Sequence, residues 1–192
     1  MIIGEGFPFE VQKIPLFQNK YYYKNAAEES ELLALLDKPG LRYIIISKVR
    51  GLPDGIIQSV KNKVSEGAAL VLVYPADSYF EALLPYTVIG YERWGPAVNR
   101  TLAGDALTGK LKTEKSYRLD DPVQRTFFRR KGLQLNEAET VYEFGNDLTP
   151  AVSFAKSGSG HVISYAMEFP GLVFREDNDM ILETLLNMIS KR

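Results

Sequence analysis

Cysteine is missing from this sequence, and histidine occurs once, as His161. A chain without cysteine forms no disulfide, no thiolate metal site and no cysteine nucleophile. A single histidine excludes the paired histidines of an H-E-x-x-H zinc motif, and any serine–histidine–aspartate triad would have to use His161. His161 follows Gly160 at the start of a predicted strand, where a structural role is favoured over catalysis. We therefore predict no metal site and no catalytic residue.

A strong net charge is also absent, because 23 lysines and arginines nearly balance 24 aspartates and glutamates. The chain therefore has no net positive charge that would attract nucleic acid or an anionic membrane. Long apolar runs are lacking too. The stretch 68–76 is far too short to span a bilayer, and the first residues show no signal-peptide pattern. These absences predict a cytoplasmic protein without a membrane or nucleic-acid partner.

Nucleotide-binding motifs are not found either. Gly4-Glu5-Gly6 lacks the third glycine of G-x-G-x-x-G, and no P-loop occurs, so we expect no cofactor. What is present is an ordinary globular composition. The chain has 192 residues, of which 45% are hydrophobic and 24% charged, enough for a substantial core. We predict a single domain over residues 1–192.

Residues 28–85 carry the clearest secondary-structure pattern. Leucines recur along 28–37 and predict a short helix. Residues 41–47 and 68–74 are nearly continuous apolar runs, typical of strands buried on both faces of a parallel sheet. Between these strands, Pro53 predicts the first turn of an amphipathic helix. Strand, helix and strand together predict a βαβ unit with a right-handed crossover.

The C-terminal part of the sequence predicts a hairpin followed by a helix. Residues 149–154 and 161–167 are strand-like and flank Ser157-Gly158-Ser159-Gly160, a turn sequence that predicts antiparallel pairing. A helix is predicted over 178–191, whereas the segment 91–136 is less regular and locally basic. We expect an α/β fold: a three-layer α/β/α sandwich with a mostly parallel, flavodoxin-like sheet and an antiparallel C-terminal hairpin.

Ligands of open α/β sheets bind in a crevice at the carboxyl ends of the strands. The residues that follow the predicted strands there form our candidate crevice: Glu5, Gly6, Tyr74, Asp77 and Ser78. A plain turn is the favoured interpretation of Glu5 and Gly6. Ser78 lacks the small neighbours that a nucleophile elbow needs, so helix capping by Asp77 or Ser78 is the favoured interpretation there.

Basic residues are dense between 91 and 136 and are interleaved with aromatic side chains. Such a pattern can bind nucleic acid or another anion, and the candidate anion-binding residues are Arg125, Arg129, Arg130 and Lys131. The favoured interpretation, for a chain of net charge −1, is a surface of mixed charged and aromatic residues over a small core rather than an anion-binding site. Asp120 and Asp121 precede Pro122 and predict a turn that opens a helix over 122–130.

Six short segments together carry a family resemblance. The segments are Tyr43-Ile44-Ile45-Ile46-Ser47, Leu52-Pro53, Val64 to Leu72, Leu83-Leu84-Pro85, Asp121-Pro122-Val123 and Ser157 to Ile163. Val64 to Leu72 is similar to the pattern V-x-x-G-G-x-L-V, with Ala68 in place of the second glycine. Asp121-Pro122-Val123 is similar to H-P-[IVL], with Asp121 in place of the histidine. Ser157 to Ile163 is similar to x-G-x-G-[RK]-V. In this order they resemble the class I glutamine-amidotransferase-like fold, especially ThuA-like (trehalose-utilisation) proteins and the trimerisation domain of some β-galactosidases.

This resemblance implies a scaffold without its amidotransferase chemistry. In amidotransferases of this fold, the nucleophilic cysteine follows the strand that matches Leu70 to Tyr74. The corresponding residues 74–78 read Tyr-Pro-Ala-Asp-Ser, and the chain has no cysteine, which excludes glutaminase activity. In branches without that activity, the fold serves as an interaction or oligomerisation module.

The sequence therefore predicts a non-catalytic binding or assembly domain. Its partner would be another protein or a second copy of the chain, and a small-molecule ligand is a further expectation. The alternative is a hydrolase that acts on a small carbohydrate-like or ester substrate. Such an enzyme would have to combine His161 with Asp77, Ser78 or Glu5.

Overall fold

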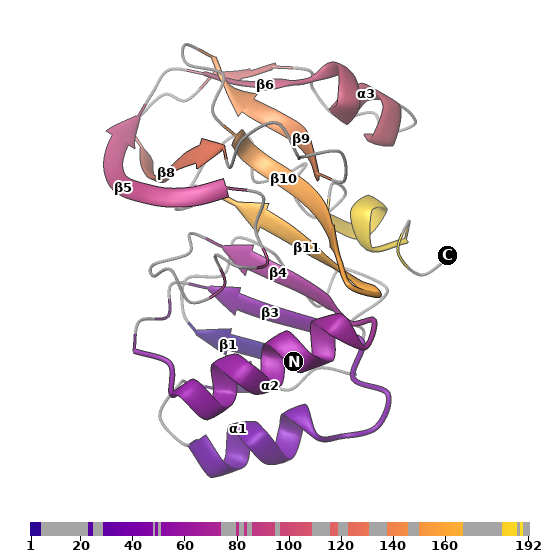
Figure 1. Cartoon of the computed structure of the whole chain (residues 1–192). Helices are drawn as coiled ribbons and strands as arrows, with labels where there is room; N and C mark the ends of the chain where they lie inside the picture. Colours follow the sequence, from indigo (N-terminus) through magenta and orange to yellow (C-terminus); the bar gives the residue numbers. More distant parts are fainter. Residues whose placement is uncertain are drawn as a thin grey trace.

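The structure is a computed structural model of the chain (Figure 1). It describes residues 1–4, 23–24, 29–47, 49, 51–73, 80, 83, 86–94, 97–108, 116–118, 123–130, 138–145, 150–166, 182–187 and 189. The strands are β1 Ile2–Gly4, β2 Tyr23–Lys24, β3 Tyr43–Ser47, β4 Ala69–Val73, β5 Tyr86–Trp94, β6 Ala97–Arg100, β7 Ser116–Arg118, β8 Val123–Arg130, β9 Ala138–Phe144, β10 Pro150–Ser157 and β11 Gly160–Tyr165. The helices are α1 Glu29–Leu36, α2 Asp54–Ser65 and α3 Leu102–Thr108, and residues 182–187 are also helical.

The predicted βαβ unit is confirmed as β3, α2 and β4, with β3 and β4 paired in parallel. Pro53 has φ −58° and ψ 144° and is the N-cap of α2, one residue before the position we predicted. Its carbonyl accepts the first helical hydrogen bond from the amide of Ile57, which the missing proline N–H does not disturb. The helix buries Ile56, Ile57, Val60 and Val64, as their spacing predicts.

A nine-stranded sheet organises the fold, in the order β2-β1-β3-β4-β11-β10-β9-β6-β7. The pairings from β2 through β11 are parallel. The β10–β11 hairpin is confirmed, with Ser157 opposite Gly160 and Gly158 at φ +61° in the turn. Antiparallel pairing continues beyond the hairpin through β9, β6 and β7. The prediction of an α/β fold with a mostly parallel sheet and an antiparallel C-terminal hairpin is therefore confirmed.

The sheet is buried on both faces at its centre, because every residue of β4 and β11 is buried. Side chains alternate between the faces of a strand, and Leu70, Leu72 and Val162 pack with α1 and α2 in one hydrophobic cluster. Figure 1 shows α1 and α2 together in front of this half of the sheet and the C-terminal helical segment behind β10. Leu182, Leu185 and Leu186 of that segment are fully buried.

The segment 91–136 contains more regular structure than its weak periodicity suggests. It includes β6, α3 and β7, and β5 and β8 form a separate two-stranded antiparallel sheet. The predicted helix over 122–130 is wrong, because residues 123–130 form strand β8. Val123, Thr126 and the two phenylalanines at 127 and 128 favour a strand, and pairing with β5 outweighs the local turn signal before Pro122.

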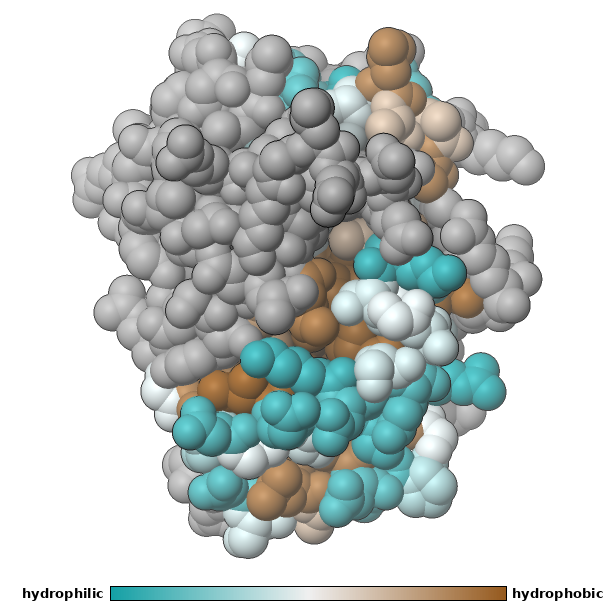
Figure 2. Space-filling model, viewed as in Figure 1, coloured by the Kyte–Doolittle hydropathy of each residue, from teal (hydrophilic) through white to brown (hydrophobic). Residues whose placement is uncertain are grey.

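No helix within the described part of the chain is long and apolar enough to cross a bilayer. Tyr23 lies in β2, at one edge of the large sheet. The exposed surface over α1 and α2 is mainly hydrophilic (Figure 2). Hydrophobic colour at the top right of the same view lies over α3, whose Leu102 is 89% exposed.

Candidate functional site

The carboxyl ends of four parallel strands meet at one edge of the sheet. Gly4 of β1 lies beside Ser47 of β3, Ser47 lies beside Val73 of β4, and Val73 lies beside Tyr165 of β11. This carboxyl edge is where open α/β sheets bind their ligands. The candidate crevice residues continue from it, since Glu5 and Gly6 follow β1 and Tyr74, Asp77 and Ser78 follow β4. All five lie outside the described residues, and the crevice remains a prediction.

The described part of the carboxyl edge is tightly packed. Gly4 has φ +111°, and a Cβ there would lie 1.9 Å from the Ser47 carbonyl oxygen. Only glycine combines this backbone conformation with so close an approach. A side chain at position 4 would therefore disturb the pairing of β1 with β3. The sequence suggested a plain turn here and gave no sign of the contact with β3.

A row of hydroxyl side chains lies one position inside this edge. Thr140, Ser153 and Ser164 are opposite one another on β9, β10 and β11, and all three are buried. The register pairs Ser164 with Leu72, so the row faces the α1 and α2 side of the sheet. Within the described residues the Ser164 Oγ has no hydrogen-bond partner, and an unsatisfied buried hydroxyl costs about 1–3 kcal/mol. Sequence reasoning missed this row because it depends on the strand register.

His161 lies at the opposite, amino edge of the sheet. It is buried on β11, level with Ala69 at the start of β4. Its ring stacks on Phe154 of β10, with centroids 5.3 Å apart and an interplanar angle of 22°. Val73 lies four residue steps after Ala69 on β4, or about 13 Å along the strand. The only imidazole of the chain is therefore packed into the hairpin at the end far from the carboxyl edge.

Three of the four candidate anion-binding residues lie on β8. Arg125 is opposite Glu92, Arg129 opposite Thr87 and Arg130 opposite Tyr86, all in the β5–β8 pair. Lys131 lies outside the described residues. The strand register thus places Arg125 against an acidic position, while the proposed role in binding an anion remains a prediction. Across the described residues, no group of three or more histidine, aspartate or glutamate side chains is arranged to hold a metal ion.

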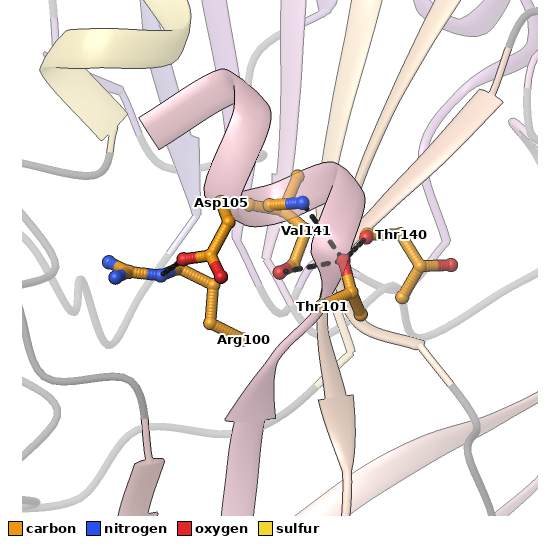
Figure 3. Close-up of polar contacts among 6 residues, drawn as sticks. Arg100, Thr101, Asp105, Thr140 and Val141 are labelled. Carbon is orange, nitrogen blue, oxygen red and sulfur yellow. Dashed lines mark hydrogen bonds and ion pairs between the residues drawn. The ribbon is translucent and has the colours of Figure 1, made fainter. Parts of the chain in front are cut away.

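A partly buried ion pair and a capping threonine fix the junction between β6 and α3 (Figure 3). Arg100 Nε donates to Asp105 Oδ1 at 2.8 Å, and the Arg100 side chain is only 4% exposed. Burial lowers the pKa of the Arg100 guanidinium, but Tyr142 and Asp105 raise it more, so that its net shift is upward. The α3 N-terminus packs closely against β9, since a Cβ on Gly104 would lie 2.1 Å from the Val141 carbonyl oxygen. This junction holds α3 and its exposed Leu102 in a defined position.

Thr101 connects α3 to β9 through its hydroxyl. The Oγ1 accepts a hydrogen bond from the Gly104 amide at 2.9 Å and donates to the Thr140 carbonyl. Thr101→Val keeps the shape but removes both bonds, and we expect it to lower the free energy of unfolding by about 1–2 kcal/mol. Urea unfolding measures this loss. Thr101→Ser retains the hydroxyl and should lose less than half as much; equal losses would contradict the capping role.

The terminal amino group of Met1 is buried beside β3. It donates a hydrogen bond to the Tyr43 carbonyl at 2.8 Å, and burial lowers its pKa from the ordinary 8.0 to about 6. The unfolded chain binds a proton here at a higher pH than the folded chain. This group therefore reduces stability progressively as the pH falls from about 8 to about 6, by about 2–3 kcal/mol in total.

The Met1 pKa can be measured directly by an NMR titration of the Met1 α-proton in the folded chain that begins at Met1. We expect a midpoint near pH 6, because desolvation favours the neutral amine. A midpoint near pH 8 would show that the amino group is solvated. The direct titration reports this one amino group, whereas the pH dependence of unfolding sums over every group that titrates.

Comparisons with known proteins add the fold relationship. No protein-family model and no curated protein sequence matches the chain. A β-galactosidase from Bacillus circulans sp. alkalophilus aligns with a TM-score of 0.58 and 12% identity, over 86% of this chain and 24% of that one. A cytoplasmic protein from Salmonella typhimurium LT2 aligns with a TM-score of 0.62 and 15% identity, over 88% and 80%. A ThuA-like protein from Bacteroides uniformis aligns with a TM-score of 0.60 and 11% identity, over 90% and 78%.

These alignments differ in how much of the other protein they include. The chain spans 24% of the β-galactosidase but 80% of the Salmonella protein. The TM-scores of 0.58–0.62 establish a shared fold, and at identities of 11–15% the likeness extends to the fold alone. The chain thus has the fold of ThuA-like proteins and of one part of a β-galactosidase, as its sequence resemblance predicted.

Proposed function

We propose that this chain is a non-catalytic domain of the glutamine-amidotransferase-like fold that acts by self-assembly. The observation that carries the proposal is the position of His161. The hydrolase alternative combines His161 with Asp77, Ser78 or Glu5, and such a pair works only when the two groups lie within hydrogen-bond reach. Here the only imidazole of the chain is stacked on Phe154 at the amino edge, while the candidate serine follows the carboxyl end of β4. No described contact favours the hydrolase alternative.

The assembly part of the proposal is supported by α3. Leu102 is the one large hydrophobic side chain that is strongly exposed among the described residues, at 89%. The Arg100–Asp105 ion pair and the Thr101 cap hold this helix against β9. A rigidly held exposed leucine is a feature of interaction surfaces when it lies in a larger apolar patch. We propose that a second copy of the chain covers it.

The remaining expectations about partners and location belong to the same proposal. A small-molecule ligand would bind at the carboxyl edge, in the crevice of Glu5, Gly6, Tyr74, Asp77 and Ser78. The net charge of −1 argues against nucleic acid as a partner. A cytoplasmic location is supported by structural neighbours that are themselves described as cytoplasmic proteins from Salmonella typhimurium.

Sedimentation equilibrium over a wide concentration range tests the proposed assembly. We expect the wild-type chain to associate reversibly and Leu102→Ser to associate at least about tenfold more weakly. Leu102→Ser should leave monomer stability within about 0.5 kcal/mol, because the side chain is exposed. A wild-type chain that stays monomeric at every concentration contradicts the assembly proposal. Association that Leu102→Ser leaves unchanged would exclude α3 as the interface.

A further inference from the structure

One side of α3 is apolar and exposed. Leu102 and Ala106 lie one helical turn apart and are both exposed, and Ala103 beside them is half-buried. The opposite side of the helix lies against β9 at Gly104, which is buried. Hydrophobic colour gathers over this helix in Figure 2. We call the surface formed by Leu102, Ala103 and Ala106 the α3 face.

The α3 face carries no charged side chain. The only charged residue of α3 is Asp105, which lies at the border of the face. Its Oδ1 accepts a hydrogen bond from Arg100 Nε at 2.8 Å, so the guanidinium offsets the charge of this carboxylate. A contact between two identical copies brings like groups together, and an uncharged face avoids the repulsion that would result.

The described residues offer one surface that matches the α3 face. Leu102 is the only large hydrophobic side chain among them that is strongly exposed. A surface cavity of about 380 Å³, the amino-edge cavity, lies where α1 and α2 end and β3 and β4 begin. It is a poor match for a leucine, because four of its lining side chains are charged: Lys38, Arg42, Lys63 and Glu66. Within the described part of the chain, the apolar surface that matches Leu102 is therefore the α3 face of a second copy.

We propose that two copies of the chain pair through their α3 faces about a two-fold axis, an inference that rests on the self-assembly proposed above. When the two α3 helices are antiparallel, Leu102 of each copy lies over Ala106 of the other, and a large side chain packs on a small one. The two Asp105 side chains then lie on the same side of the helix pair, each offset by the Arg100 of its own copy. A two-fold contact closes at two copies and leaves no α3 face for a third. Because α3 has only seven residues, the contact is small and the dimer is reversible.

Cross-linking through a single cysteine tests the symmetry, because the chain has no cysteine of its own. A thiol at position 106 meets a second thiol only when the same residue of two copies lies at the contact. We therefore expect Ala106→Cys to give a covalent dimer with a short bismaleimide. The matched control is Ala34→Cys, which changes an exposed alanine on the mainly hydrophilic surface over α1 and α2. The control should stay uncross-linked at the same protein concentration.

Opposite charges at position 106 give a second test. Ala106→Glu and Ala106→Lys should each associate at least about tenfold more weakly than the wild type, because each variant repels its own copy. An equimolar mixture of the two should form mixed dimers, in which the new charges attract. Position 106 is exposed, so both variants should fold, and circular dichroism checks this.

Sedimentation equilibrium separates the outcomes of this inference from those of the self-assembly proposal. If the wild type associates but Ala106→Cys does not cross-link, the two-fold arrangement is overturned and self-assembly stands. The same follows if the mixture associates no better than either charged variant alone, or if the assembly is larger than a dimer. Equal cross-linking of Ala34→Cys would also overturn the inference, since the α3 face would not be the specific contact. A wild-type chain that stays monomeric overturns both proposals.

Discussion

Gly160→Ala is expected to lower the free energy of unfolding by about 3 kcal/mol or more. A Cβ at position 160 would lie 2.2 Å from the Val64 carbonyl oxygen and 2.3 Å from the Ala68 carbonyl oxygen. Both contacts are with backbone, so neither can be relieved by rotating a side chain. The end of α2 and the start of β4 would have to move away from β11, and overpacking of this kind is strongly destabilising.

Urea unfolding of Gly160→Ala should be compared with that of Gly55→Ala. Gly55 lies in the first turn of α2, where an added Cβ meets only the end of the Glu29 side chain, 2.8 Å from its Oε1. That side chain can rotate away, and alanine is the better helix former by about 1 kcal/mol. We expect Gly55→Ala to be neutral or stabilising. If the two variants have similar unfolding midpoints, the close packing at Gly160 is contradicted.

Leu36→Ala should cost about 2–5 kcal/mol, the second large effect that we expect. Leu36 is completely buried at the end of α1, in the cluster that joins both helices to the sheet. Truncation removes its transfer free energy and leaves a cavity that the surrounding strands cannot fill. Differential scanning calorimetry would record the loss as a lower melting temperature and a smaller enthalpy of unfolding.

Leu102→Ala is the matched control for Leu36→Ala, because it is the same substitution in another helix. Leu102 is 89% exposed, so its truncation should change monomer stability by less than about 0.5 kcal/mol. The comparison is made at low concentration, where self-association does not contribute. A loss at Leu102 comparable with that at Leu36 would mean that α3 is covered within the monomer.

Local sequence patterns predicted the elements whose buried side chains follow a regular spacing along the chain. The continuous apolar runs of β3 and β4 and the spacing of Ile56, Val60 and Val64 follow directly from being covered by neighbouring layers. The turn at Ser157 to Gly160 has residues that favour a tight hairpin. These segments place the βαβ unit and the hairpin with little dependence on distant parts of the chain.

Features that depend on pairing between distant segments were not predictable. The turn signal at Asp121-Pro122 predicted a helix over 122–130, and the pairing of residues 123–130 with β5 outweighs that signal. The hydroxyl row of Thr140, Ser153 and Ser164 exists only because the register of β9, β10 and β11 brings these positions together. The amino-edge cavity likewise joins the ends of separate helices and strands.

Gly160 and His161 show how the structure changes the interpretation of a local signal. The sequence around Gly160 suggests a turn glycine, but the residue does not have a positive φ. Its lack of a Cβ instead allows its backbone to lie close to the carbonyl oxygens of Val64 and Ala68. His161 reads as a polar residue at a strand start, and the structure buries it against Phe154. Both residues join the hairpin to the parallel half of the sheet, which is a structural role.

The most direct test of the account is whether the purified chain hydrolyses anything through His161. Rates should be measured with p-nitrophenyl esters and glycosides for the wild type, Ser78→Ala and His161→Asn, with circular dichroism to confirm folding. We expect all three proteins to leave the rate equal to that of buffer alone, since the only imidazole of the chain is packed at the amino edge. A wild-type rate above buffer that both substitutions abolish, with the fold intact, would contradict a non-catalytic domain.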